Sequence, residues 1–131
     1  MCYTESMTPE LTEHAEHAEL SPYCPVFQEG MELIGRRWTG SIVRSLLAGS
    51  NRFGEILARI PGLSDRLLSE RLRELEAAHI VTRTVYPDVP VRIEYSLTDK
   101  GRELEDIVNA ISKWADKWGP ACAEQSARLE S

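Results

Sequence analysis

The chain has 131 residues, of which 42% are hydrophobic and 27% charged, a composition typical of one globular domain with its own core. It contains no run of about 18 apolar residues, which excludes a membrane-spanning helix. Its first residues lack the basic and apolar regions of a secretory signal, so we expect a cytoplasmic protein. The net charge of −6, taken alone, argues against nucleic-acid binding.

The charge is unevenly distributed along the chain. Residues 1–34 carry a net −7, residues 35–102 a net +4 and residues 103–131 a net −3. All but one of the cations in the central segment are Arg, the side chain best suited to forked contacts with phosphate and guanine. The central segment is therefore a candidate DNA-binding region, with a solvated charged face as the alternative interpretation.

The chain is expected to have three parts: a flexible acidic arm over residues 1–22, a folded domain over 23–119 and a flexible tail over 120–131. In the domain, apolar residues at helical spacing predict a first helix that begins at Pro25, which suits a first turn, and ends at Gly35. A second helix is predicted from Thr39, as its N-cap, to Gly49.

A helix–turn–helix pattern follows. A short third helix is predicted over residues 52–60, stopped by Pro61 and Gly62, and Ser64 is the expected N-cap of a fourth helix with Asp65 in its first turn. The leucines of this fourth helix recur at three-to-four spacing and form one face. Its opposite face carries polar and charged side chains, namely Arg66, Ser69, Glu70, Arg73 and Glu74.

The apolar pattern then changes to the alternation of β-strands. Residues 81–86 and 91–97 predict two strands joined by a proline-containing hairpin tip. After them, Thr98 is the expected N-cap of a single helix that runs to Trp118, roughly 30 Å long. Its broad apolar stripe ends in two Trp residues one turn apart, which favours contact with a partner chain because Trp is enriched in interface cores.

This order of elements predicts a mainly α (α+β) fold: a winged helix-turn-helix with a two-stranded β wing and a long C-terminal dimerisation helix. In such a fold the fourth helix can lie in the major groove of DNA, which admits one α-helix. The wing can reach the neighbouring backbone or minor groove. The cationic excess falls on these elements and favours that function.

Six motifs in one order and spacing resemble the HxlR family of bacterial transcriptional regulators, over about residues 24–118. They are residues 24–26 (Cys-Pro-Val), 34–39 (Ile-Gly-Arg-Arg-Trp-Thr), 52–56 (Arg-Phe-Gly-Glu-Ile), 60–64 (Ile-Pro-Gly-Leu-Ser), 68–76 (Leu-Ser-Glu-Arg-Leu-Arg-Glu-Leu-Glu) and 90–98 (Pro-Val-Arg-Ile-Glu-Tyr-Ser-Leu-Thr). The sequence departs from the family at Arg37, usually Lys, and at Gly54, usually Asn.

The resemblance implies a cytoplasmic homodimer that binds double-stranded operator DNA. It also implies that the first and the last helix make the dimer contacts. The candidate interface residues on these helices are Phe27, Met31, Leu104, Ile107, Ile111, Trp114 and Trp118.

The candidate DNA-binding residues form three groups. The fourth helix supplies Ser64, Asp65, Arg66, Ser69 and Arg73, of which Arg66 and Arg73 are expected to contact guanine or phosphate. The wing supplies Arg83 and Arg92 as phosphate clamps, and a cross-strand pair with Glu94 is the alternative for Arg83. The third group, at helix starts where backbone donors favour anions, is Arg36, Arg37 and Arg52.

Cys24 is the candidate sensor residue. It opens the first helix, where the helix-terminal donors favour a thiolate. In some members of the HxlR family such an N-terminal Cys senses oxidants, quinones or aldehydes, through modification or an intersubunit disulfide. A packed structural Cys is the alternative. Cys2 and Cys122 lie in the expected flexible ends, where they are either incidental or resolving thiols for Cys24.

Two alternatives to a redox-sensing regulator stay open. One is a regulator of the same family that responds to a small ligand between its dimerising helices, and the other is a winged helix used for protein–protein contact. His14 and His17 could hold a metal on a helix, but no Cys/His spacing completes a site, so neither a metal nor a cofactor is expected. The sequence shows no catalytic triad and no glycine-rich phosphate loop, so an enzyme is not expected.

Overall fold

The structure is a computed structural model that describes residues 20–119. The chain divides into two compact units, residues 1–39 and residues 40–131. In the first unit, helix α2 spans Pro25–Ile34, with Cys24 as its N-cap and Gly35 as its C-cap. None of the residues of α2 is buried. The predicted first helix is thus confirmed at both ends.

Helix α3 spans Thr39–Leu47 and leads into the second unit. Thr39 is its first helical residue, so the prediction that Thr39 is the N-cap is wrong by one position. At the other end Gly49 has a φ of +104°, and the amide of Ser50 donates to the carbonyl of Ser45 at 3.1 Å. This is the Schellman pattern of a helix end, in which glycine tolerates the left-handed conformation.

Helices α4 (Phe53–Arg59) and α5 (Asp65–Ala77) form the predicted helix–turn–helix. At the start of α4, the Glu55 carboxylate accepts hydrogen bonds from the amides of Asn51 (3.1 Å) and Arg52 (3.3 Å). At the start of α5, the Ser64 hydroxyl accepts from the amide of Leu67 at 3.1 Å. Both caps satisfy amides that a helix start otherwise leaves without partners.

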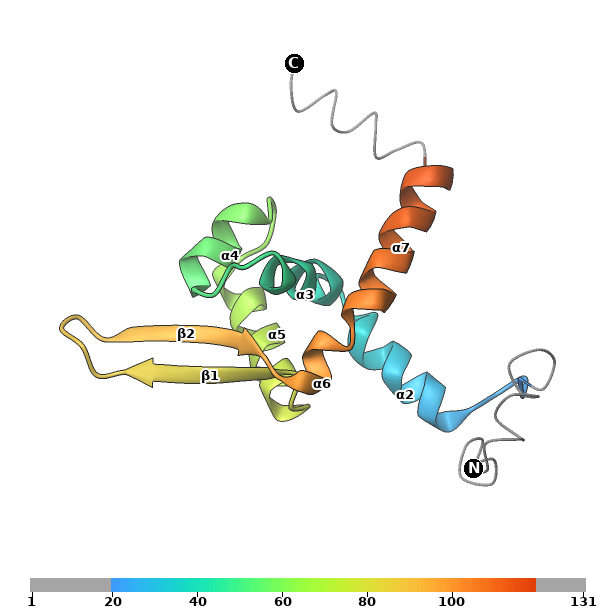
Figure 1. The fold of residues 1–131 in the computed structure, drawn as a ribbon, viewed down its shortest axis with the longest axis horizontal. Helices are drawn as coiled ribbons and strands as arrows, with labels where there is room; N and C mark the ends of the chain where they lie inside the picture. The colour runs from blue at the N-terminus through green and yellow to red at the C-terminus, as the bar shows by residue number, and fades with distance from the viewer. Residues whose placement is uncertain (1–19, 120–131) are drawn as a thin grey trace, which may run out of the picture. The chain divides into compact units, whose positions relative to one another are not determined.

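The wing is an antiparallel pair of strands, β1 (Val81–Tyr86) and β2 (Arg92–Leu97), which extends away from the helices as a long hairpin (Figure 1). Its register pairs Val81 with Leu97 and Tyr86 with Arg92. The amide of Tyr95 also donates to the carbonyl of Asn51 at 2.7 Å, so β2 is joined to the segment that precedes α4.

The last predicted helix is broken in two, α6 (Asp99–Arg102) and α7 (Glu105–Trp118), so the prediction of one continuous helix is wrong. The amide of Leu104 donates to the carbonyl of Gly101, three residues back, at 3.0 Å. This tighter turn replaces the four-residue spacing of an α-helix and separates α6 from α7 (Figure 1). At about 1.5 Å per residue, α7 is only about 21 Å long.

The core of the second unit is formed by the buried aliphatic side chains of α3, α4, α5 and the base of the wing. They are Ile42, Val43, Leu46, Ile56, Ile60, Leu63, Leu68, Leu72, Leu75, Ile80, Val81 and Leu97. Over residues 20–119 the fold is therefore mainly helical with one two-stranded sheet, as predicted. None of the described helices is long and apolar enough to cross a membrane. The predicted arm and tail fall mostly outside the described residues, and the domain boundaries stay a prediction.

Candidate DNA-binding surface

Helix α5 has one face in the core and one face in solvent. Leu68, Leu72 and Leu75 are at most 2% exposed, which fixes how the helix is rotated against the core. The solvent face therefore carries the charged and polar side chains that the sequence placed opposite the leucines. Arg71 lies between the two faces, is 8% exposed and hydrogen-bonds to Glu74.

The solvent face of α5 borders an open hollow of about 540 Å³, which we call the recognition hollow. Five of its lining residues belong to α5, and the sixth comes from the start of α4: Asp65, Arg66, Ser69, Glu70, Arg73 and Phe53. The structure thus brings four of the five predicted α5 residues to one concave surface. Ser64, the fifth, caps the helix beside it.

Within the recognition hollow, Arg66 and Glu70 form an ion pair with 3.4 Å between Nε and Oε2. The Arg66 side chain is 87% exposed, and an ion pair so open to water contributes little stability. Another anion can therefore replace Glu70 at low cost. Arg73 is exposed as well.

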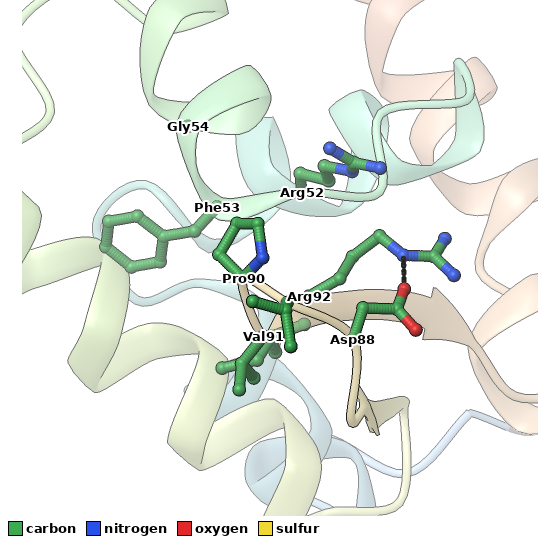
Figure 2. Close-up of a pocket in the computed structure, with 9 residues that line it drawn as sticks. Arg52, Phe53, Gly54, Asp88, Pro90, Val91 and Arg92 are labelled. Carbon is green, nitrogen blue, oxygen red and sulfur yellow. Dashed lines mark hydrogen bonds and ion pairs between the residues drawn. The ribbon is translucent and has the colours of Figure 1, made fainter.

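A second hollow, of about 480 Å³, separates the wing from the start of α4. We call it the wing hollow. The start of α4 and the wing line it together, through Arg52, Phe53, Gly54, Asp88, Val89, Pro90, Val91, Arg92 and Ile93 (Figure 2). Phe53 lines both hollows and was not singled out from the sequence, because an aromatic residue at helical spacing there indicates core packing.

Arg92, predicted as a phosphate clamp, already has partners on the wing. Its Nε lies 3.2 Å from Asp88 Oδ2, and one of its terminal nitrogens lies 2.7 Å from Glu94 Oε2. Its guanidinium also stacks 4.1 Å from the centre of the Tyr86 ring. Desolvation opposes the charge of Arg92, but the hydrogen bond to Asp88 and the carboxylate of Glu94 outweigh it and raise its pKa.

Arg83 is exposed on β1 and lies opposite Tyr95 in the register. Glu94 lies opposite Thr84, on the other face of the hairpin, and pairs with Arg92 instead. The alternative interpretation of Arg83, a cross-strand pair with Glu94, is therefore wrong. Its role as a phosphate contact stays a prediction.

Arg36 and Arg37 belong to the first unit, directly before α3. Both are exposed, and the guanidinium of Arg37 lies 5.2 Å from the centre of the Trp38 ring. Their predicted contact with phosphate is not tested by this geometry.

Cys24 caps α2, and its sulfur accepts a hydrogen bond from the amide of Phe27 at 3.4 Å. The same sulfur is part of a disulfide bond. The other two cysteines of the chain, Cys2 and Cys122, lie outside the described residues, as do His14 and His17. A helix-terminal amide directed at the sulfur favours its thiolate form once the disulfide is reduced.

Both candidate dimerisation helices expose large apolar side chains. On α7, four of them recur at helical spacing and are between 44% and 66% exposed: Ile107, Ile111, Trp114 and Trp118. On α2, Phe27 is 60% and Met31 is 43% exposed. Leu104, also predicted to be an interface residue, is half-buried in the turn before α7.

Among residues 20–119, no group of three His, Cys, Asp or Glu side chains could hold a metal ion. The described surface has two neighbouring hollows that contain cations, a capped helix with an exposed polar face and a hairpin beside it. This arrangement suits an extended polyanion better than a small substrate.

The sequence model of the HxlR-like helix-turn-helix family matches residues 33–123 of this chain. The chain is 54% identical to YvaP of Bacillus subtilis, described as an uncharacterized HTH-type transcriptional regulator, over 75% of this chain and 91% of YvaP. It is 42% identical to the HTH-type transcriptional regulator YodB of the same organism, over 72% of this chain and 85% of YodB.

Solved structures of two regulators have the same fold. The reduced form of YodB from B. subtilis matches with a TM-score of 0.66 at 40% identity, covering 76% of this chain and 97% of YodB. The redox regulator HypR in its reduced form matches with a TM-score of 0.69 at 38% identity, covering 77% of this chain and 99% of HypR.

Proposed function

We propose that this chain, which belongs to the HxlR-like helix-turn-helix family and is a transcriptional regulator, binds operator DNA as a homodimer. The proposal includes a response to oxidants or electrophiles through Cys24. In the complex, α5 occupies the major groove and the wing lies on the adjacent backbone. The observation that carries the proposal is the recognition hollow, where α5 presents two Arg side chains beside Ser69 and two carboxylates.

The dimensions of α5 fit this role. Arg66 and Arg73 are seven residues apart, about 10.5 Å along the helix axis, which spans about three base steps of DNA. Two guanidinium groups at that spacing can bind guanine edges or phosphates within one groove. Asp65 and Glu70 would repel phosphates, so they fit best toward base edges, where a cytosine amine can donate to a carboxylate.

The DNA test begins with a duplex selected by the wild-type protein from a random-sequence library. Its dissociation constant is then measured by fluorescence anisotropy over a range of salt concentrations. Arg66→Ala is expected to weaken binding by roughly 1–3 kcal/mol. The matched control is Arg102→Ala, which removes an exposed Arg from α6, outside both hollows, and is expected to bind like wild type.

Two outcomes would contradict the DNA proposal. Equal affinities of the Arg66→Ala variant and the wild type would remove Arg66 from the interface. Failure of the wild type to select or bind any duplex at low salt would favour the alternative, a winged helix used for protein–protein contact.

The dimer proposal rests on the apolar stripe of α7, which the single chain leaves exposed. A run of large apolar side chains with two Trp residues is typical of an interface core, and the family assigns this position to a second copy of the chain. Trp114→Glu is expected to shift the protein from dimer to monomer in sedimentation velocity. Asn109→Glu, on the opposite face of α7, is the matched control, and equal effects of both variants would contradict the proposal.

The sensor proposal rests on the position of Cys24 and its disulfide, and on the named redox regulator among the structural matches. When diamide oxidises two thiols, they lose two hydrogen atoms to its N=N bond, which becomes a hydrazine, and an S–S bond forms. Diamide is expected to release the wild type from its duplex, dithiothreitol to restore binding, and Cys24→Ser to abolish the release.

Non-reducing electrophoresis of Cys2→Ser and Cys122→Ser variants identifies the thiol that pairs with Cys24. Mass spectrometry after quinone or aldehyde treatment detects adducts on Cys24. Identical release of wild type and Cys24→Ser would contradict the sensor proposal and favour the other alternative, a ligand bound between the dimerising helices.

A further inference from the structure

The tip of the wing holds a cluster of one cation, two carboxylates and one aromatic ring. Arg92 hydrogen-bonds through Nε to Asp88 at 3.2 Å and through a terminal nitrogen to Glu94 at 2.7 Å. The face of its guanidinium lies on the Tyr86 ring, 4.1 Å from the centre. One side chain therefore contacts three others within a single hairpin.

These contacts connect the two strands and the loop between them. Tyr86 is the last residue of β1, Arg92 is the first residue of β2, and Asp88 lies in the loop, where its amide donates to the carbonyl of Tyr86 at 2.7 Å. A two-stranded hairpin has little stability of its own, so such contacts decide how its tip is held. Arg92 is placed to hold the loop against both strands.

The same contacts make Arg92 a poor ligand for phosphate. Asp88, Arg92 and Glu94 together carry a net charge of −1, and the Arg92 side chain is only 35% exposed. A phosphate that approached this guanidinium would meet both carboxylates. To bind it, Arg92 would have to leave partners that already satisfy its charge.

Arg52 lies on the opposite wall of the wing hollow and is less constrained than Arg92. It is exposed, and although its charge acts on the nearby Glu55 carboxylate, it forms no ion pair within the part of the chain that the structure describes. Its backbone is held by the Glu55 carboxylate at the start of α4. Figure 2 shows the guanidinium groups of Arg52 and Arg92 extending toward the same side of the hollow, with that of Arg92 joined to Asp88.

We propose that Arg92 is a positioning residue, whose guanidinium stays on Asp88 and Glu94 when DNA binds, and that Arg52 is the phosphate ligand of the wing hollow. This inference rests on the proposed DNA-binding function. It assigns different tasks to two cations that the sequence predicted, each in its own element, to contact phosphate. Arg92 acts through the wing tip, which it holds in the conformation that meets the DNA backbone.

The first test compares salt dependence, using the duplex selected with the wild-type protein. Arg52→Gln is expected to lower the slope of log K against log salt by about 0.9, which corresponds to roughly eightfold weaker binding at 0.1 M salt. Arg92→Gln is expected to weaken binding several-fold while the slope stays that of wild type. A slope that falls by about 0.9 in Arg92→Gln would overturn the proposal.

Arg92→Lys separates the two roles further. Lysine keeps the positive charge and binds phosphate as a point charge, but it cannot form a fork between two carboxylates while stacking on a ring. A positioning role predicts that Arg92→Lys binds as weakly as Arg92→Gln. Binding equal to that of wild type would show that the charge alone matters, which would overturn the proposal.

The second test observes the wild-type protein by NMR and uses a variant only to assign the signal. The Nε–H signal of Arg92 in a proton–nitrogen NMR spectrum, assigned from its loss in Arg92→Lys, is expected to keep its shift when the duplex is added, whereas that of Arg52 moves. A large shift of the Arg92 signal on DNA binding would overturn the proposal.

Hydrogen exchange measured on the DNA-free protein distinguishes failure of this inference from failure of the proposed function. Asp88→Asn is expected to speed hydrogen exchange of the Arg92 Nε–H. The control is Glu76→Gln, which changes an exposed residue of α5 and is expected to leave this exchange rate unchanged. Unchanged exchange in Asp88→Asn would overturn the positioning role even if the protein binds DNA. Absence of any DNA binding by wild type would instead overturn the proposed function.

Discussion

Thr98 connects the residues that follow α5 to the start of α6 through its hydroxyl group. The oxygen lies 2.6 Å from the carbonyl of His79 and 3.2 Å from that of Ile80, and it accepts a hydrogen bond from the amide of Gly101 at 3.0 Å. His79 has a φ of +61° and follows the end of α5. Removal of this hydroxyl is therefore expected to loosen the junction between α5 and the helices that follow the wing.

The Thr98 hydroxyl has one proton, so the magnitude for Thr98→Ala follows from the one hydrogen bond that it accepts and the shorter of the two that it can donate. The N-cap bond from Gly101 is worth about 1 kcal/mol, and the hydrogen bond to the carbonyl of His79 adds about 0.5–1.5 kcal/mol. The unfolding free energy is therefore expected to fall by about 2 kcal/mol. In a domain of this size, this loss of unfolding free energy corresponds to a fall in Tm of roughly 8–16 °C.

The assay is urea unfolding and thermal unfolding followed by circular dichroism. Thr98→Ser keeps the hydroxyl and is expected to lose less than half as much stability as Thr98→Ala. Thr82→Ala, which removes an exposed threonine from β1, controls for loss of the side chain itself. If Thr98→Ala unfolds within about 0.5 kcal/mol of wild type, or if Thr98→Ser unfolds like Thr98→Ala, the hydroxyl does not hold the junction.

Three further predictions concern the caps and packing around the candidate site. The amides of Asn51 and Arg52 lower the pKa of Glu55 from its usual 4.5, against a smaller opposing effect of desolvation. The stabilisation is therefore present above about pH 4.5 and is lost as the pH falls through the folded-state pKa. Glu55→Gln should thus unfold at lower urea than wild type at pH 7, with a difference that shrinks as the pH falls below 4.5; a constant difference would contradict this. Leu68→Ala removes a fully buried side chain beneath the recognition hollow and should cost about 2–5 kcal/mol in urea unfolding, and a loss below 1 kcal/mol would show that the site is not packed. Gly101→Ala places a methyl group on the carbonyl oxygen of Ile80 and should destabilise the domain strongly in thermal unfolding, whereas Gly40→Ala, with open space around it, should not; equal Tm values would contradict the close approach.

Helix α5 was predictable because local signals agree with one another. Ser64 is a strong N-cap, and the leucines at three-to-four spacing determine which face is buried. Once that face is fixed, Arg66 and Arg73 must point to solvent. The buried and exposed faces of a periodic helix can be predicted without knowing which elements pack against it.

The task of each cation on the wing was not predictable in the same way. Alternation shows that Arg83 and Arg92 lie on strands, but the ion pairs depend on the register and on the conformation of the hairpin tip. Only the folded hairpin shows that Glu94 and Asp88 pair with Arg92 and that Glu94 faces away from Arg83. Electrostatic partners depend on distances of a few ångströms, which the order of residues does not specify.

The break between α6 and α7 has a similar explanation. Apart from Gly101, the residues from Asp99 to Trp118 are compatible with a helix, and helical periodicity continues through Leu104. The close approach of Gly101 to the backbone of Ile80, and the cap from Thr98, hold the first turn against the base of the wing. Contacts between segments distant in sequence thus override local preference.

The amino-acid sequence by itself determined the fold class, the family, the face of α5 that points outward and the cations available for DNA, because helix caps, periodicity and motif order are local properties. The tertiary structure decided which of those residues share a surface and which are already paired. It placed Phe53 between the two hollows and held Arg92 on two carboxylates, while Arg52 stayed exposed. The physical reason is that charge pairing and concavity arise from side chains of different elements, whose separation is set only when the core packs.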